Sequence, residues 1–88
     1  MNREDIRTAL VANMQAVIEG ARGVEIGEQQ SLVDDFGADS LEIVEVVSRT
    51  MKKLKIKVPR TELGKAKNIG ELIDLFVKAS SGAEATAP

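Results

Sequence analysis

Aliphatic residues recur at spacings of three and four in three segments of this 88-residue chain, and this pattern restricts its fold more than any other feature. The segments span about residues 3–19, 40–53 and 69–79, and the spacing places their apolar side chains along one face of a helix. Only two Phe and no Tyr or Trp are present, so the core between these faces must be aliphatic. The pattern predicts an all-α fold, a small helical bundle with a single core.

Capping signals and apolar faces define the three predicted helices. Asp39 followed by Glu42 has the spacing of a capping box, with Ser40 as the first helical residue, and Asn68 with Glu71 repeats that spacing. The residues expected to face inward are, helix by helix, Ile6, Leu10, Met14, Val17 and Ile18; Leu41, Val44, Val47, Met51 and Leu54, widened by Ile43 and Val46; and Ile69, Leu72, Ile73 and Phe76.

The connections between these helices carry apolar residues of their own. Residues 54–58 alternate between apolar and polar, and because no other segment alternates, we interpret them as an extended connection that places Ile56 and its apolar neighbours in the core. Pro59 then permits a short helical turn at about residues 61–65, the third helix of a four-helix bundle. The stretch from 20 to 39 is long for a loop inside a compact domain. The residues expected to anchor it are Val24, Ile26, Leu32, Val33 and Phe36.

Residues 1–79 are therefore expected to form the folded domain, and residues 80–88, which are small and polar, a flexible tail. No apolar run is long enough to span a bilayer and the first residues are too polar for a signal peptide, so we expect a soluble, cytoplasmic protein with no membrane partner. The absence of Cys and His excludes disulfides, thiolate nucleophiles, Cys/His zinc sites and imidazole acid–base chemistry.

Charge is unevenly distributed along the chain, since residues 1–48 carry a balance of −7 and residues 49–88 a balance of +5. Such a dipolar surface can orient charged partners, although most of the individual charges are expected to be solvated. The basic region 49–67 raises the alternative of a nucleic-acid-binding module. It contains no aromatic stacking residue and the net charge of the chain is −2, so we expect no nucleic-acid partner.

An independent enzyme is a second alternative, because Asp34, Asp35 and Asp39 could together hold a divalent cation. The chain has neither His nor Cys to support catalysis. We therefore interpret the three carboxylates as solvated charge or as a surface that a modifying enzyme contacts, and we expect no metal and no catalytic residue.

Ser40 differs from these carboxylates, because it is expected to be the first residue of a helix. An exposed Ser at the start of a helix lies where backbone N–H groups and the helix dipole favour an attached phosphate. Because the chain has no His to activate this hydroxyl, another enzyme would have to modify it.

The string FGADSLE at residues 36–42 resembles the phosphopantetheine attachment motif of acyl carrier proteins, Gly-x-Asp-Ser-Leu. In that family the Ser is esterified with the 4′-phosphopantetheine arm of coenzyme A, whose thiol carries acyl groups as thioesters. The resemblance covers about Ile6 to Val77. It implies an acyl-carrier-protein-like four-helix bundle and a non-catalytic carrier, with Ser40 as the attachment site modified by a phosphopantetheinyl transferase.

The resemblance also implies which residues contact partners. Asp39 matches the acidic neighbour used in transferase recognition, and Leu41 matches the apolar residue that partners commonly contact. Glu42 and Glu45 match the acidic start of the recognition helix, although Glu in a first turn also stabilises the helix dipole. The expected partner-binding residues are Asp39, Leu41, Glu42, Glu45, Val46, Arg49, Ile56 and Arg60.

The second half of the chain departs from the pattern of fatty-acid carriers. Arg49, Lys52 and Lys53 stand where those carriers usually stay acidic. Residues 54–63 and 66–72 resemble instead the stand-alone donor carriers of polyketide β-branching cassettes. That resemblance implies a carrier that donates acetyl, or sometimes propionyl, groups to a homologue of 3-hydroxy-3-methylglutaryl (HMG) synthase.

Further partners implied by the resemblance are an acyltransferase or ketosynthase-like decarboxylase and other polyketide synthase enzymes, all met by a monomeric carrier. The alternative within the family is a general discrete acyl carrier protein for fatty-acid or polyketide chain initiation or extension. Such a carrier would hold malonyl or a growing acyl chain.

Overall fold

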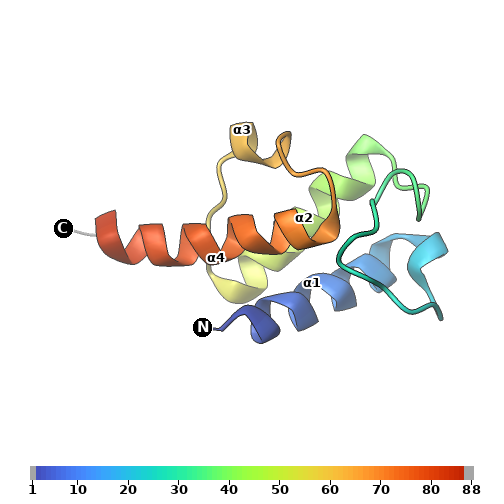
Figure 1. The fold of residues 1–88 in the computed structure, drawn as a ribbon, viewed down its shortest axis with the longest axis horizontal. Helices are drawn as coiled ribbons and strands as arrows, with labels where there is room; N and C mark the ends of the chain where they lie inside the picture. The colour runs from blue at the N-terminus through green and yellow to red at the C-terminus, as the bar shows by residue number, and fades with distance from the viewer. Residues whose placement is uncertain (1, 87–88) are drawn as a thin grey trace.

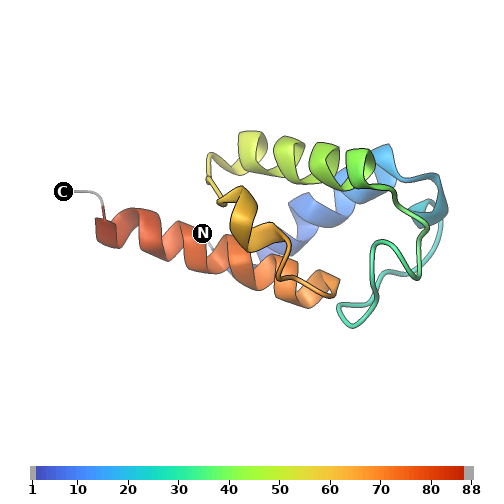
Figure 2. The ribbon, with the colours of Figure 1, turned by 90° about the horizontal axis from the view of Figure 1, so that it is seen from above.

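The computed structural model describes the backbone of residues 2–86 and the side chains of residues 2–59 and 61–80. Its elements are, in chain order, α1 (Arg3–Val17), the 3₁₀ helix η1 (Glu19–Ala21), α2 (Ser40–Leu54), α3 (Arg60–Leu63) and α4 (Ile69–Thr86) (Figure 1). α1 packs against α2 and α4, and α3 packs against α4; Figure 2 shows α3 lying between α2 and α4. The predicted all-α bundle with a short third helix is confirmed, and no strand occurs among the described residues.

α1 begins at a capped end and stops where the chain turns into the core. The Asn2 side chain accepts a hydrogen bond from the Asp5 backbone N–H at 2.9 Å, which satisfies one of the free donors of the first turn. The helix ends at Val17 rather than near Glu19, because Ile18 adopts an extended backbone and buries its side chain. The buried residues of α1 are Ile6, Ala9, Leu10 and Met14.

α2 starts with the predicted capping box and ends on a left-handed residue. The Asp39 carboxylate accepts the Glu42 N–H at 2.8 Å, and the Glu42 carboxylate accepts the Asp39 N–H at 3.0 Å. At the other end Lys55 has a φ of 57°, in the region that favours Gly. The two caps fix Ser40 as the first helical residue and Leu54 as the last, one residue beyond the predicted end.

The buried face of α2 differs from the predicted one, because Leu41 is 80% exposed and Val44 is 41% exposed. The buried residues of α2 are Val46, Val47 and Thr50. Thr50 belongs to the core because its hydroxyl donates to the Val46 carbonyl oxygen at 2.8 Å and accepts from Asn13 Nδ2 at 2.9 Å. This polar residue shifts the centre of the buried face around the helix, and Leu41 comes to lie nearly opposite it.

The long loop between η1 and α2 is anchored by three apolar side chains rather than five. Ile26, Leu32 and Phe36 are buried, whereas Val24 and Val33 are about half exposed, so the prediction is wrong for those two. Backbone hydrogen bonds supply the remaining anchoring. Two N–H groups of the first turn of α4 donate to carbonyl oxygens of this loop at 2.8 and 3.0 Å.

An ion-pair network joins the same loop to α1 and, through Arg3, to α4. Arg3 of α1 contacts Glu28 of the loop at 2.7 Å and Asp74 of α4 at 3.1 Å, and Arg7 contacts Glu28 at 3.4 Å. The hydrogen bond from Arg3 is the main reason why the pKa of the Glu28 carboxyl is lowered. The network thus links three elements that are distant in sequence.

The connection between α2 and α3 is extended, as predicted, and buries Ile56 and Val58. The Val58 N–H donates to Sδ of Met51 at 3.2 Å, and a thioether sulfur is a weak acceptor. α3 then spans Arg60–Leu63, close to the predicted helical turn.

α4 is longer than predicted, because it runs to Thr86 instead of ending near residue 79. The added residues include two Ala, a strong helix former, and the next Pro of the chain is residue 88. The predicted tail is therefore helical to Thr86, residues 87–88 lie outside the described part of the chain, and flexibility of the tail stays a prediction. None of the described helices combines the length and apolarity needed to cross a membrane.

Candidate functional site

Ser40 is the first residue of α2, and its side chain is exposed to solvent. The N–H groups of a first helical turn have no acceptors within the helix and carry the positive end of its dipole. The Asp39 cap satisfies one of them, the N–H of Glu42. The other first-turn donors lie beside the Ser40 hydroxyl, where they favour a phosphate. Ser40 therefore fits a group that is attached to protein through a phosphate ester.

The chain reaches Ser40 through a closely packed turn. Phe36 and Ala38 are buried, and Gly37 between them has a φ of 69°, which a residue with a side chain rarely adopts. A methyl group at Gly20 would lie 2.5 Å from the Phe36 carbonyl oxygen, so only Gly allows η1 to approach the turn this closely. The motif residues before Ser40 thus hold the backbone that positions its hydroxyl.

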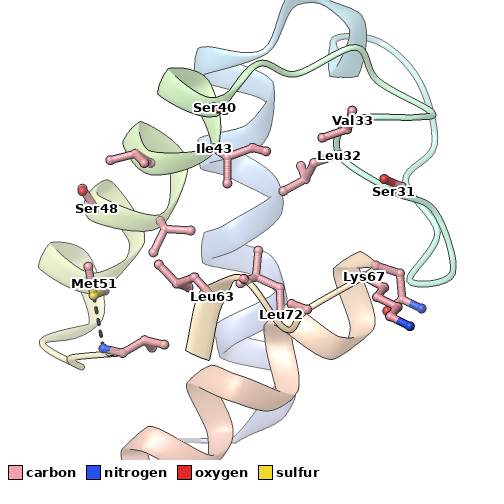
Figure 3. Close-up of a pocket in the computed structure, with 16 residues that line it drawn as sticks. Ser31, Leu32, Val33, Ser40, Ile43, Ser48, Met51, Leu63, Lys67 and Leu72 are labelled. Carbon is pink, nitrogen blue, oxygen red and sulfur yellow. Dashed lines mark hydrogen bonds between the residues drawn. The ribbon is translucent and has the colours of Figure 1, made fainter. Parts of the chain in front are cut away.

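A pocket of about 590 Å³ opens beside Ser40, between α2, α3 and the loops at residues 31–33 and 66–68 (Figure 3). Its apolar lining comes mainly from Leu32, Ile43, Val47, Met51, Leu63 and Leu72. Ser31, Ser48 and Lys67 are among its polar lining residues. The apolar lining residues show the same sequence pattern as core residues, so no sequence signal distinguishes this pocket from the core.

Several predicted partner-binding residues lie on the exposed surface near Ser40. Leu41 projects into solvent, and Asp39 is also exposed although its carboxylate caps α2. Glu42 is partly buried because its carboxylate completes the capping box. Glu45 and Arg49 form an ion pair at 2.7 Å, with about half of each side chain exposed. These five residues present one apolar and four charged side chains beside the candidate attachment site.

Two other predicted partner-binding residues lie in the core instead of on the surface. Val46 is 0% exposed because it belongs to the buried face of α2, and Ile56 is 6% exposed because the extended connection turns it inward. Their side chains pack beneath the surface residues and are not exposed to a partner. Arg60 is the first residue of α3, and its side chain lies outside the described residues.

The cation site considered for three Asp residues is not formed. Among the side chains that the structure describes, no group of three carboxylates is close enough to hold a metal ion. The Asp35 carboxylate instead accepts a hydrogen bond from the Ser31 N–H at 2.6 Å, and Asp39 caps α2. These carboxylates stabilise local backbone.

Comparison with known proteins identifies relatives of similar length. The family model described as "Phosphopantetheine attachment site" matches residues 9–76. The polyketide biosynthesis acyl-carrier-protein AcpK of Bacillus subtilis (strain 168) is 33% identical over 76 residues, which cover 86% of this chain and 92% of that protein. An acyl carrier protein of Clostridium acetobutylicum is 35% identical over 60 residues, which cover 68% of this chain and 77% of that protein.

A solved structure shares the fold as well. The crystal structure of the curacin biosynthetic pathway HMG synthase in complex with acetyl donor-ACP contains a chain that matches with a TM-score of 0.76 and 31% identity, covering 91% of this chain and 99% of that chain. Because an 88-residue chain covers nearly all of it, the matched chain is the small carrier of that complex. The family model spans Ser40 and almost the whole bundle, and the chain therefore belongs to the acyl carrier proteins, which carry acyl groups on 4′-phosphopantetheine in polyketide and fatty-acid biosynthesis.

Proposed function

We propose that Ser40 is the residue to which 4′-phosphopantetheine is attached, and that the loaded protein donates acetyl groups to an HMG synthase in polyketide β-branching. The position of Ser40 carries the proposal, because its exposed hydroxyl opens α2 and stands at the rim of a largely apolar pocket. When bound, the cofactor supplies the thiol that holds the acyl group as a thioester.

Attachment to Ser40 needs a phosphopantetheinyl transferase. The new ester bond joins Ser40 Oγ to the phosphorus of the arm, the P–O bond to the bridging oxygen of the coenzyme A diphosphate breaks, 3′,5′-ADP leaves with that oxygen, and the hydroxyl proton leaves to a base. This chain has no His, and the neighbouring Asp39 carboxylate accepts a hydrogen bond from the Glu42 N–H, so we assign the base to the transferase. The part of this chain is to hold the hydroxyl in solvent, flanked by the exposed Asp39 and Leu41.

The attachment site is tested by intact-protein mass after incubation with coenzyme A, magnesium and a broad-specificity phosphopantetheinyl transferase. The wild type is expected to gain one phosphopantetheine and Ser40→Ala none. Ser48→Ala is the matched control, because Ser48 is another exposed Ser of α2 that lines the same pocket. A mass gain on Ser40→Ala, or its loss on Ser48→Ala, would contradict the assignment.

The donor role rests on two similarities. The carrier in the curacin complex is an acetyl donor, and it matches 91% of this chain. Residues 54–63 and 66–72, which form the connection after α2, α3 and the start of α4, resemble donor carriers of β-branching cassettes. An acyltransferase or a ketosynthase-like decarboxylase would provide the acetyl group.

The pocket favours a second candidate function, that of a general discrete carrier for chain initiation or extension. Its volume of about 590 Å³ far exceeds the space that an acetyl group occupies. An apolar cavity of this size suits a longer acyl chain, whose burial contributes roughly 0.8 kcal/mol per CH₂ group.

Acyl transfer separates the two candidates. The protein is loaded with acetyl or malonyl phosphopantetheine, and each form is offered to the HMG synthase of the curacin pathway and to a polyketide ketosynthase. A donor is expected to give acetyl transfer to the synthase and little malonyl condensation with the ketosynthase. The reverse preference would reject the donor role and leave Ser40 as the attachment site of a general carrier.

A further inference from the structure

The solvent-facing side of α2 forms one continuous stripe that starts beside Ser40. Leu41, Glu45, Ser48 and Lys52 follow one another at spacings of four, three and four, which places them on the same side of the helix. All four are exposed, and they lie opposite the buried face that contains Val46. Any partner that contacts Leu41 while reaching Ser40 therefore faces the whole stripe.

The charge of the surface changes sign along this stripe. Near Ser40 the exposed side chains are apolar or acidic, as Leu41 and Asp39 show, and Glu45 farther along is paired with Arg49. The other end of the stripe carries Lys52, and three more exposed lysines follow within five residues; we call these four the basic patch: Lys52, Lys53, Lys55 and Lys57. Among the described side chains, no ion pair joins any of these lysines to a carboxylate. The basic patch is thus available to a partner.

The electrostatics of the helix end explain only part of the basic patch. Lys52 and Lys53 lie in the last turn of α2, where a cation stabilises the helix dipole. Lys55 and Lys57 follow the helix. Lys55 occupies a left-handed position that Gly adopts with less strain, and Lys57 points outward because its neighbours in the extended connection are buried.

We propose that the basic patch docks an acidic surface on the enzyme that receives the acyl group from this carrier. Lys52 lies twelve residues after Ser40, about 18 Å along the helix axis. The receiving enzyme is therefore expected to carry an acidic patch roughly 18 Å from the entrance to its active site. Because the two ends of the stripe differ in charge, this contact fixes the direction in which α2 lies across the enzyme.

Charge complementarity favours a protein over a nucleic acid as the partner that binds the basic patch. A polyphosphate strand laid along α2 from the lysines would pass Arg49, which is paired with Glu45, and would then meet the carboxylates of Glu42 and Asp39 at the start of the helix. No aromatic residue lies between positions 49 and 67 to stack on bases. An enzyme surface, in contrast, can carry acidic side chains opposite the lysines and none opposite the carboxylates.

The test compares the single charge reversals Lys52→Glu and Lys78→Glu in fully loaded protein. Lys78 is an exposed lysine of α4, so both variants change the net charge equally. Equal loading is checked by mass and folding by circular dichroism. Lys52→Glu is expected to lower kcat/KM for acetyl transfer to the curacin HMG synthase about tenfold at low salt, through KM, while Lys78→Glu stays within about twofold. Lys52→Arg should keep the wild-type value, and high salt should reduce the difference.

Equal effects of the two reversals, or a Lys52→Glu defect that salt does not change, would overturn the proposal. Binding of a short DNA duplex by the wild type and not by Lys52→Glu, with unchanged acyl transfer, would assign the basic patch to nucleic acid instead. The inference rests on the proposed carrier function, but the experiment distinguishes the failure of the inference from the failure of the proposed function. If only the ketosynthase accepts the wild type, the donor role fails. The values of kcat/KM for Lys52→Glu, Lys78→Glu and the wild type are then compared with the ketosynthase as the receiving enzyme.

Discussion

The two sides of the bundle are held in different ways. We call the tied side the part formed by α1, the loop at residues 26–30 and residues 69–76 of α4, where the Arg3 network and backbone hydrogen bonds join three elements. We call the open side the part formed by the pocket, the connection after α2 and α3. There a four-residue helix follows a connection in which the Val58 N–H donates to a thioether sulfur.

This difference places most of the restraint away from the candidate site. The tied side buries apolar side chains and satisfies its polar groups across elements that are distant in sequence. The open side contains a pocket, which reduces the packing between its elements. Segments with few cross-element contacts open at low free-energy cost, and a carrier that visits several enzymes needs such a surface. Mutations on the two sides should therefore affect different properties.

The largest expected contrast is between Phe76→Ala and Val44→Ala. Phe76 is 0% exposed in the core, so its truncation should lower the free energy of unfolding by roughly 3–5 kcal/mol. Val44 lines the pocket and is 41% exposed, so its truncation should cost less than about 1 kcal/mol. Urea unfolding followed by circular dichroism measures both, and equal losses would remove the distinction between the two sides.

Substitution of Thr50 tests the contact between α1 and α2, which the hydrogen bond from Asn13 to Thr50 joins. Thr50→Val keeps the shape of the side chain but leaves the Asn13 amide without its acceptor, so we expect a loss of about 1–3 kcal/mol. Ser48→Ala on the outer face of the same helix should be nearly neutral. Thermal unfolding of the two variants makes the comparison. A neutral Thr50→Val would show that the hydroxyl contributes nothing to the fit of these helices.

Lys55 offers a stabilising change on the open side. Its φ of 57° suits Gly, so Lys55→Gly should raise the free energy of unfolding by roughly 0.5–1 kcal/mol. Lys57→Gly, in an extended backbone a few residues later, should instead lower stability. If Lys55→Gly is destabilising, the left-handed end of α2 is not under strain.

The smallest expected effect is a difference in acid sensitivity between Glu28 and Glu62. The pKa of each carboxyl is lowered, chiefly by a hydrogen bond from Arg3 for Glu28 and from Lys65 for Glu62. A lowered folded-state pKa adds stability above the unfolded value of 4.5, and this stability is lost as pH falls through the folded-state pKa.

Glu28→Gln should therefore flatten the fall of the melting temperature below pH 4.5 more than Glu62→Gln does. The Glu28 carboxylate pairs with Arg3 and Arg7 of α1, which are distant in sequence, whereas Glu62 and Lys65 are neighbours in sequence that stay close without the fold. Melting temperatures from neutral pH down through this range provide the measurement. A larger change for Glu62→Gln would mean that the Arg3 network does not support the tied side.

Local signals explain which features could be predicted from the sequence. The capping box of Asp39 and Glu42 depends on residues three apart, and the alternation around Ile56 depends on neighbours, so both were expected correctly. The buried face of α2 was not, because Thr50 counts as polar in any apolar pattern while its hydroxyl is satisfied inside the bundle. The exposed Leu41 has the same apolar character as a core residue.

The candidate site likewise has one part that local sequence signals predict and one part that they do not. Ser40 is recognised from the residues beside it, whereas the pocket depends on where α3 and two loops lie relative to α2. The contact of Arg3 with Asp74 joins residues 71 positions apart, and nothing in either segment alone indicates the other. The sequence underestimates the length of α4, because small polar residues often end a helix whereas Ala can continue one.

The start of α1 and the end of α4 lie at the opposite end of the molecule from the start of α2 (Figures 1 and 2). A tag, surface linkage or fused protein joined near either helix end would consequently leave the hydroxyl of Ser40 unobstructed. This geometry allows the protein to be immobilised on a sensor chip or a bead in a single orientation. Enzymes that load and unload it could then be passed over the same molecules in succession.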